Sequence, residues 1–276
     1  MSLVRSELLK IRTTNTWWLF GLGAFVMLVL AFAFNAISAH FTLQAAREIP
    51  PNATPEQAEQ IRAQADSLFQ AANLFTSGQF FGLLFVMLLG ILVVTNEFYH
   101  QTATTTFLAT PHRTAVVLAK LVTAALFGVV VWLVTTVLSI PAGVIFLRSQ
   151  GVADHLGEWG TTRPILLNLL AYVLWGILGV GLGVLIRSQI GATVTAALAY
   201  VLGTFAAGII FTLLAQKWEW TGKLQVIVPS IASQLMISGT DLPGNPPQWV
   251  GALVLIGYAV VTGVIGTLLM RTRDIS

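Results

Sequence analysis

Long apolar segments alternate along the chain with short polar ones. Six stretches of 22 residues or more contain no Asp, Glu, Lys, Arg or His. At about 1.5 Å per residue, 22 helical residues extend roughly 33 Å, which crosses a hydrocarbon core of about 30 Å. The stretches are continuously apolar instead of alternating, and lipid offers no partner for open strand edges, so we expect helices. The sequence therefore predicts an all-α integral membrane protein, with residues 1–276 as a single transmembrane domain and six transmembrane helices at 17–39, 74–95, 116–147, 164–186, 190–214 and 249–270.

The basic residues predict the orientation of these spans. An even number of spans places both termini on one side, and Lys and Arg near the spans favour the cytoplasm. Eight basic residues lie on the terminal side and six on the other, and the eight sit in shorter segments. We therefore predict a protein of the cell membrane with both termini cytoplasmic. The first apolar run has 23 residues, longer than the roughly 7 to 15 of a signal peptide, so we expect it to be retained. The terminal-side residues are Arg5, Lys10, Arg12, Arg113, Lys120, Arg187, Arg271 and Arg273.

The first 16 residues have the pattern of an amphipathic helix at the membrane surface. Apolar residues cluster on one helical face, and the basic residues lie largely elsewhere. Glu7 interrupts the apolar arc, so a basic lead-in that only fixes orientation is the alternative. The apolar residues are Leu3, Val4, Leu8 and Ile11, and the basic ones are Arg5, Lys10 and Arg12.

Three features lie in or near the predicted outer connections. Thr54 and Gln57 fit a capping box, which predicts an outer helix that leads into the second span. Pro141 predicts a kink, or a change to an interfacial segment, near the outer end of the third span. Residues 224–239 are apolar but too short to cross with margin, so we expect a re-entrant outer segment before the last span, with a lid packed on the spans as the alternative.

Composition removes several classes of function. Only 9% of the residues are charged, whereas a soluble domain carries about 25%. The net charge is +3, but the basic residues are dispersed, so we expect no nucleic acid partner. There is no cysteine, the four histidines fall on both sides of the membrane, and no Gly-Lys-Ser or Gly-Lys-Thr occurs. We therefore expect neither a metal site, nor a cofactor, nor enzymatic activity on this chain.

The predicted spans carry no charge in their interior. Lys120 lies near the inner interface, where we expect its side chain to snorkel toward water. Proton-coupled transporters and intramembrane metal enzymes usually need buried ionisable groups, so both classes lose support. Two pairs of glycines have the small-xxx-small spacing of packed membrane helices, although lipid-facing positions are the alternative. The pairs are Gly78 with Gly82 and Gly179 with Gly183.

The connection between the second and third spans, residues 96–113, carries the most specific signal. It contains in order Glu97, Phe98, His100, Gln101, Thr102, Leu108, Pro111 and Arg113, with Lys120 soon after. This order resembles the second inner loop of the permease subunits of ABC type-2 (ABC-2) transporters, in which an acid, an aromatic residue, His or Arg, Gly or Gln, and Thr precede Leu, Pro, Arg and Lys. Residues 6–14, followed by the Trp17–Trp18 pair, are also similar to the start of such permeases. Over the rest of the chain the likeness is one of architecture.

The resemblance implies a half-transporter that pairs with a second permease copy or a paralogue. A separate ABC ATPase subunit would hold ATP and Mg and drive it. Residues 2–14 and 97–113 would rest on that ATPase, with Glu97 anchoring the loop. Gln101 stands where many relatives have glycine. The coupling residues implied are Glu97, Phe98, His100, Gln101, Thr102, Phe107, Leu108, Pro111 and Arg113. The residues assigned to the interfacial helix, which would also contact membrane lipid, are Arg5, Leu8, Lys10, Ile11 and Arg12.

Three functions therefore stay open at the level of sequence. The first is an ATP-driven exporter of an apolar or amphipathic cargo such as a drug, lipid or peptide, because uncharged spans offer no partner for a charged ligand. The second is an ATP-independent transporter or channel that uses neutral polar groups. The third is a membrane scaffold. The neutral groups of the second hypothesis include Asn35, Thr135, Thr136 and Asn168.

Overall fold

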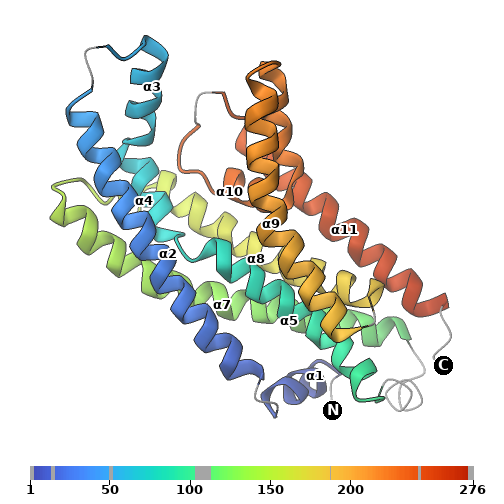
Figure 1. The fold of residues 1–276 in the computed structure, drawn as a ribbon. Helices are drawn as coiled ribbons and strands as arrows, with labels where there is room; N and C mark the ends of the chain where they lie inside the picture. The colour runs from blue at the N-terminus through green and yellow to red at the C-terminus, as the bar shows by residue number, and fades with distance from the viewer. Residues whose placement is uncertain are drawn as a thin grey trace.

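The computed structural model describes residues 3–13, 16–49, 52–102, 113–186, 188–241 and 244–272. This part of the chain is helical and contains no strand, and six of its helices are long and apolar enough to cross a membrane (Figure 1). The predicted all-α class and the six predicted spans are confirmed, which indicates a multi-pass membrane protein. The elements are α1 (Leu3–Arg12), α2 (Thr16–Arg47), α3 (Pro55–Gln64), α4 (Ser67–Phe75), α5 (Gln79–Tyr99), α7 (Arg113–Ser149), α8 (Trp159–Leu185), α9 (Gln189–Ala215), the 3-10 helix η1 (Glu219–Ile227), α10 (Pro229–Met236) and α11 (Gln248–Thr272).

Helices α5 and α8 form the centre of the bundle, and their contact is the most extensive between any two described elements. The apolar faces of α2 and α9 are mostly exposed, as expected for helices that face lipid. A Cβ added at Gly179 would overlap the Met87 carbonyl, and one at Gly183 would lie 2.9 Å from the Ile91 carbonyl oxygen. These glycines let the backbones of α8 and α5 touch.

The other predicted glycine pair lies at the start of α5. A Cβ at Gly82 would overlap the phenol of Tyr172, and one at Gly78 would lie 2.6 Å from Cδ1 of Leu28. Tyr172 also donates a hydrogen bond to the Gly78 carbonyl at 3.1 Å. Both positions therefore face neighbouring helices and not lipid.

The bundle has two unlike ends, which we call the α1 end and the α3 end. Helix α2 has 32 residues, about 48 Å of helix, so it is longer than a hydrocarbon core of about 30 Å is thick. Its far end stands beside α3 and α4 (Figure 1). Thr54 and Gln57 form the predicted capping box, with reciprocal bonds of 3.2 and 3.1 Å.

The helix predicted to run from Thr54 into the second span is instead broken twice. Asp66 accepts a hydrogen bond from the Phe69 amide at 3.0 Å and caps a new helix, α4. A turn at residues 76–78 then separates α4 from α5. A side chain that satisfies the first amides of a new helix favours such a break, and the apolar spacing does not reveal it.

Of the two alternatives expected at Pro141, a kink or a change of segment, the chain does not show the change of segment. Helix α7 continues as one α-helix from Arg113 to Ser149. Proline removes one backbone hydrogen bond, but Ile140, Val144 and Leu147 pack with Phe75 of α4 around it. This packing holds the turns on both sides of the proline.

The apolar segment 224–239 does not cross the bundle. It contributes to η1 and to α10, whose eight residues extend about 12 Å. Ser233 of α10 is fully buried; its hydroxyl accepts from Trp175 Nε1 at 2.8 Å, and its carbonyl accepts from Gln79 Nε2 at 3.2 Å. The segment therefore packs between spans at the α3 end.

Candidate functional site

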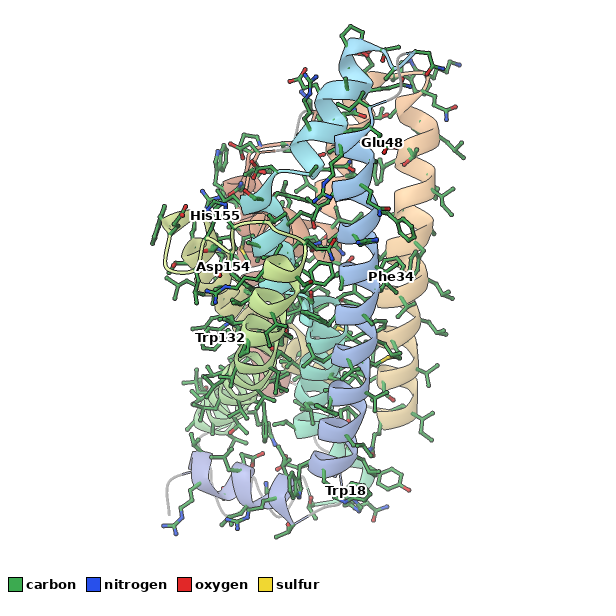
Figure 2. All side chains as sticks on the ribbon, turned by 90° about the vertical axis from the view of Figure 1, so that its left-hand side faces the viewer. Trp18, Phe34, Glu48, Trp132, Asp154 and His155 are labelled. Atoms are coloured by element: carbon green, nitrogen blue, oxygen red, sulfur yellow. The ribbon has the colours of Figure 1, made fainter. Side chains whose placement is uncertain are left out.

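Helix α1 lies across one end of the bundle, beneath the spans (Figure 2). Its amphipathic character agrees with the prediction, because Ile11 is buried and Leu8 half-buried, whereas Arg5 and Arg12 are exposed. The buried side also contains Glu7, which is only 4% exposed. An acid on the buried side needs a positive partner.

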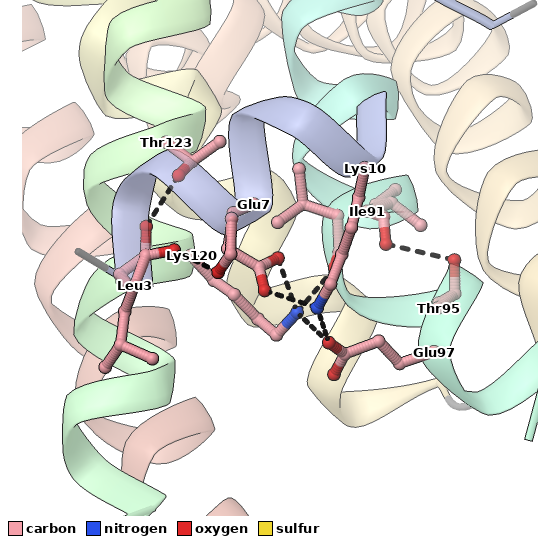
Figure 3. Close-up of polar contacts among 11 residues, drawn as sticks. Leu3, Glu7, Lys10, Ile91, Thr95, Glu97, Lys120 and Thr123 are labelled. Atoms are coloured by element: carbon pink, nitrogen blue, oxygen red, sulfur yellow. Dashed lines mark hydrogen bonds and ion pairs between the residues drawn. The ribbon is translucent and has the colours of Figure 1, made fainter. Parts of the chain in front are cut away.

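Two acids and two lysines meet where α1 crosses the bundle (Figure 3). The carboxylate of Glu7 bridges Lys10 at 2.7 Å and Lys120 at 2.9 Å. The carboxylate of Glu97 contacts the same two ammonium groups, Lys10 at 2.5 Å and Lys120 at 3.1 Å. Positive and negative groups alternate, so the four charges sum to zero. The network joins α1 to both α5 and α7.

Lys120 does not snorkel, because its side chain is fully buried. Its ammonium group donates to Glu7 and also to the Val93 carbonyl at 2.9 Å. Together with the carboxylate of Glu97, these two oxygen acceptors replace the water molecules that would otherwise solvate the ammonium group. The expectation that the third span carries no buried charge is therefore wrong at its α1 end.

The electrostatics of Lys10 follow from the same network. Partial burial alone would lower its pKa, but hydrogen bonds and charge attraction from Glu7 and Glu97 outweigh that effect and raise the pKa above 10.5. Lys10 therefore stays protonated at physiological pH.

Such a network resists separation once it is formed. Burying an ion costs several kcal/mol, and removing one member of a buried pair costs about 3–5 kcal/mol because its partner is left uncompensated. Glu7, Glu97 and Lys120 are each at least nine-tenths buried. Helix α1 is therefore fastened to α5 and α7 by ionic bonds as well as by apolar contact.

The sequence-predicted coupling residues divide into two groups. Phe98 packs against the buried cluster that includes Val94, Val117 and Val180, while His100, Gln101 and Thr102 are exposed at the end of α5. Phe107, Leu108 and Pro111, and the side chain of Arg113, lie outside the described residues.

Gln101 has a φ of 55°. This left-handed conformation is one that glycine adopts at no steric cost. This conformation explains why a glycine suits position 101. Gln101 adopts the same left-handed conformation.

The sequence did not reveal the ion pair between Glu7 and Lys120. The available signals were an acid in the apolar arc of α1 and a lysine inside an apolar span. Among the described residues, no group of three His, Cys, Asp or Glu side chains could hold a metal ion.

Comparison with known proteins places the chain in a family. The model of the family described as protein of unknown function (DUF2705) matches residues 26–276, and the chain belongs to this family. No curated protein matches the sequence.

Proposed function

We propose that this DUF2705 chain is the membrane-spanning permease subunit of an ATP-driven exporter of the ABC-2 type. A separate ATPase subunit would bind ATP and Mg, and a second permease copy or a paralogue would complete the transporter. One observation carries the proposal: a surface helix, α1, is joined by buried charges to the two spans that flank the segment resembling an ABC-2 coupling loop.

The geometry favours force transmission through α1. A motor outside the membrane must act on an element that is accessible and also joined to the spans. Arg5, Leu9 and Arg12 are exposed on α1, whereas Glu7 holds the helix to Lys120 of α7. A displacement of α1 would therefore move α5 and α7 with it.

The centre of the bundle would pass such a displacement onward. The glycines of α8 bring its backbone against α5, with Gly179 at Met87 and Gly183 at Ile91. Close-packed elements move as units or change between discrete arrangements, because they have no free volume to absorb a shift. Motion at the α1 end would thus reach the core of the transport unit.

The buried polar groups away from the α1 end favour an apolar or amphipathic cargo, such as a drug, lipid or peptide. Thr136, Ser139, Asn168 and Tyr172 are buried in α7 and α8, and all are neutral. A charged ligand would find no fixed counter-charge among them. Trp17 and Trp18 are exposed at the start of α2, and Figure 2 shows Trp18 near α1. Exposed tryptophans are expected at a membrane interface, and we assign this end to the cytoplasm.

Co-purification from native membranes tests the proposal. The tagged chain is extracted in mild detergents, and the eluate is scored for a stoichiometric nucleotide-binding subunit and for ATP hydrolysis. The double variant Leu9→Ala with Tyr99→Ala removes exposed apolar side chains at the α1 end and should lose the ATPase. The matched control, Trp220→Ala with Leu224→Ala, removes similar groups at the opposite end and should retain it.

The other outcomes separate the competing functions. Absence of any ATPase in several detergents would refute the proposal. Cargo flux by the purified chain alone in liposomes would then indicate an ATP-independent carrier or channel. Absence of both ATPase and flux would indicate a scaffold.

A further inference from the structure

A serine, a histidine and a glutamate are linked in series at the α3 end. Ser67 Oγ lies 2.7 Å from His155 Nε2, and His155 Nδ1 lies 2.9 Å from Glu158 Oε1. Ser67 is half-buried at the start of α4, and the His155 side chain is 22% exposed, so both residues are partly open to solvent. Figure 2 shows His155 in the connection between α7 and α8. His155 is therefore not the freely solvated side chain that its loop position suggests.

We propose that these residues form a second site, which cleaves carboxylic esters of apolar acyl groups through an acyl-serine intermediate. Ser67 is the nucleophile, His155 the general base, and Glu158 a positioning residue. The inference does not rest on the proposed transport function, because the site lies at the end of the bundle opposite α1.

The hydrogen bonds define the protonation that this chemistry needs. A carboxylate only accepts, so His155 donates to Glu158 from Nδ1. Its Nε2 then carries a lone pair and accepts from the Ser67 hydroxyl. This is the arrangement in which a serine, a histidine and an acid make a serine nucleophilic.

The backbone holds His155 in place. Its φ of 48° is a conformation that residues other than glycine seldom adopt, and its carbonyl accepts from the Thr161 hydroxyl at 2.7 Å. The preceding Asp154 is fixed by Arg148 at 2.8 Å and by the Leu156 amide at 3.1 Å. Strain of this kind persists only where the surroundings over-determine it, and it concentrates at functional sites.

The helix that carries the nucleophile can also stabilise the oxyanion. Ser67 is the first residue of α4, so the amide that follows it, that of Leu68, belongs to the first turn and has no intrahelical acceptor. The amide after the nucleophile is a common oxyanion donor, and the positive end of the helix dipole favours the developing charge. A Cβ at Gly160 would lie 2.5 Å from Leu68, so glycine allows the start of α8 to approach α4 closely.

The reaction needs no oxidant or cofactor. Ser67 Oγ attacks the ester carbonyl while His155 Nε2 takes its proton. The tetrahedral adduct then expels the alcohol, which receives that proton, and an acyl-Ser67 is left. Water attacks the acyl group as Nε2 accepts its proton, and the return of the proton to Ser67 Oγ releases the carboxylic acid.

Exposure and neighbouring side chains narrow the substrate class. The Glu158 side chain is 61% exposed, so water screens its interaction with His155, and the serine is less activated than in a buried triad. Esters, which have better leaving groups than amides, are therefore expected. Leu156 and Trp159 follow His155 and Glu158 directly in the sequence and are 53% and 68% exposed, which favours an apolar acyl chain.

A fluorophosphonate probe tests the site directly on the full chain in lipid nanodiscs. The wild-type protein should be labelled at Ser67, as located by peptide mass spectrometry. Ser67→Ala should abolish labelling, and His155→Gln should slow it at least about 100-fold, the usual contribution of a general base. Ser149→Ala is the matched control with unchanged labelling, because that hydroxyl donates to the Phe146 carbonyl instead of an imidazole.

Hydrolysis of p-nitrophenyl butyrate separates the role of Glu158 from a structural one. Glu158→Gln should lower kcat and leave KM unchanged. A wild-type protein that is not labelled at Ser67 would overturn the proposal, and this result does not depend on the folding of any variant. Equal labelling of wild type and His155→Gln would overturn it as well.

Discussion

Replacing Lys120 by Met should release α1 from the bundle. Methionine has a similar length, so the substitution removes the charge while largely preserving the packing. Lys120 Nζ contacts Glu7 at 2.9 Å, Glu97 at 3.1 Å and the Val93 carbonyl at 2.9 Å, so all three of its protons have acceptors. After the substitution, two buried carboxylates share one half-exposed lysine, Lys10.

The size of the effect follows from the uncompensated negative charge that the substitution leaves in the buried network. Removing one partner of a buried ion pair costs about 3–5 kcal/mol. Since each 1.4 kcal/mol is a factor of ten, the equilibrium between docked and released α1 should shift by about 10² to a few times 10³.

A single introduced thiol measures this shift, because the chain contains no cysteine. Ile11→Cys places the thiol on the buried side of α1, where Ile11 is 6% exposed, and Leu9→Cys on the exposed side sets the unhindered rate. Maleimide should label Ile11→Cys slowly, and adding Lys120→Met should accelerate labelling toward the Leu9→Cys rate. Adding Glu7→Gln as well leaves Glu97 and Lys10 as a neutral pair and should restore part of the protection. If Lys120→Met changes the labelling rate of Ile11→Cys by less than about threefold, Lys120 does not hold α1 on the bundle.

A substitution in the core and a change of pH test two other contacts. Gly179→Ala, whose Cβ would overlap the Met87 carbonyl, should destabilise the protein by about 1–3 kcal/mol and lower its Tm in detergent. Gly203→Ala is the control and should change Tm little, because a Cβ there meets open space. Equal changes in Tm would contradict the packing of α5 against α8. The Leu156 amide and Arg148 hold the pKa of Asp154 below 3.8, so the stabilisation of this loop is present above pH 3.8 and is lost as pH falls through the lower folded-state pKa. As the pH is lowered, pepsin cleavage within residues 150–158 should therefore begin to increase at a lower pH in the wild type than in Arg148→Gln. Identical pH profiles of cleavage in the two proteins would contradict the contact between Arg148 and Asp154.

The length and apolar continuity of each span made the helices predictable. The ends of the helices were less predictable, because a helix can continue beyond the membrane boundary. The span predicted at 17–39 continues as α2 to Arg47, and the one at 74–95 continues to Tyr99. The second extension places Glu97 in the last turns of α5 instead of in a loop.

The ion network was only partly visible in the sequence. Glu97 was singled out by the family resemblance, and Glu7 by its disruption of an apolar arc. Glu7 and Lys120 are 113 positions apart, and only the path of the chain brings them together. The same limit applies to Ser67 and His155, which are 88 positions apart and share no local motif.

Photocrosslinking from α1 tests whether an ATPase subunit acts on this helix. A photoreactive phenylalanine analogue replaces Leu9, which is exposed on α1, and in a second protein replaces Trp220 at the opposite end. After irradiation of native membranes, the probe at position 9 should capture a nucleotide-binding ATPase subunit, and the probe at position 220 should not. Capture of lipid alone from position 9 in native membranes would contradict the assignment of α1 as the element on which the ATPase acts.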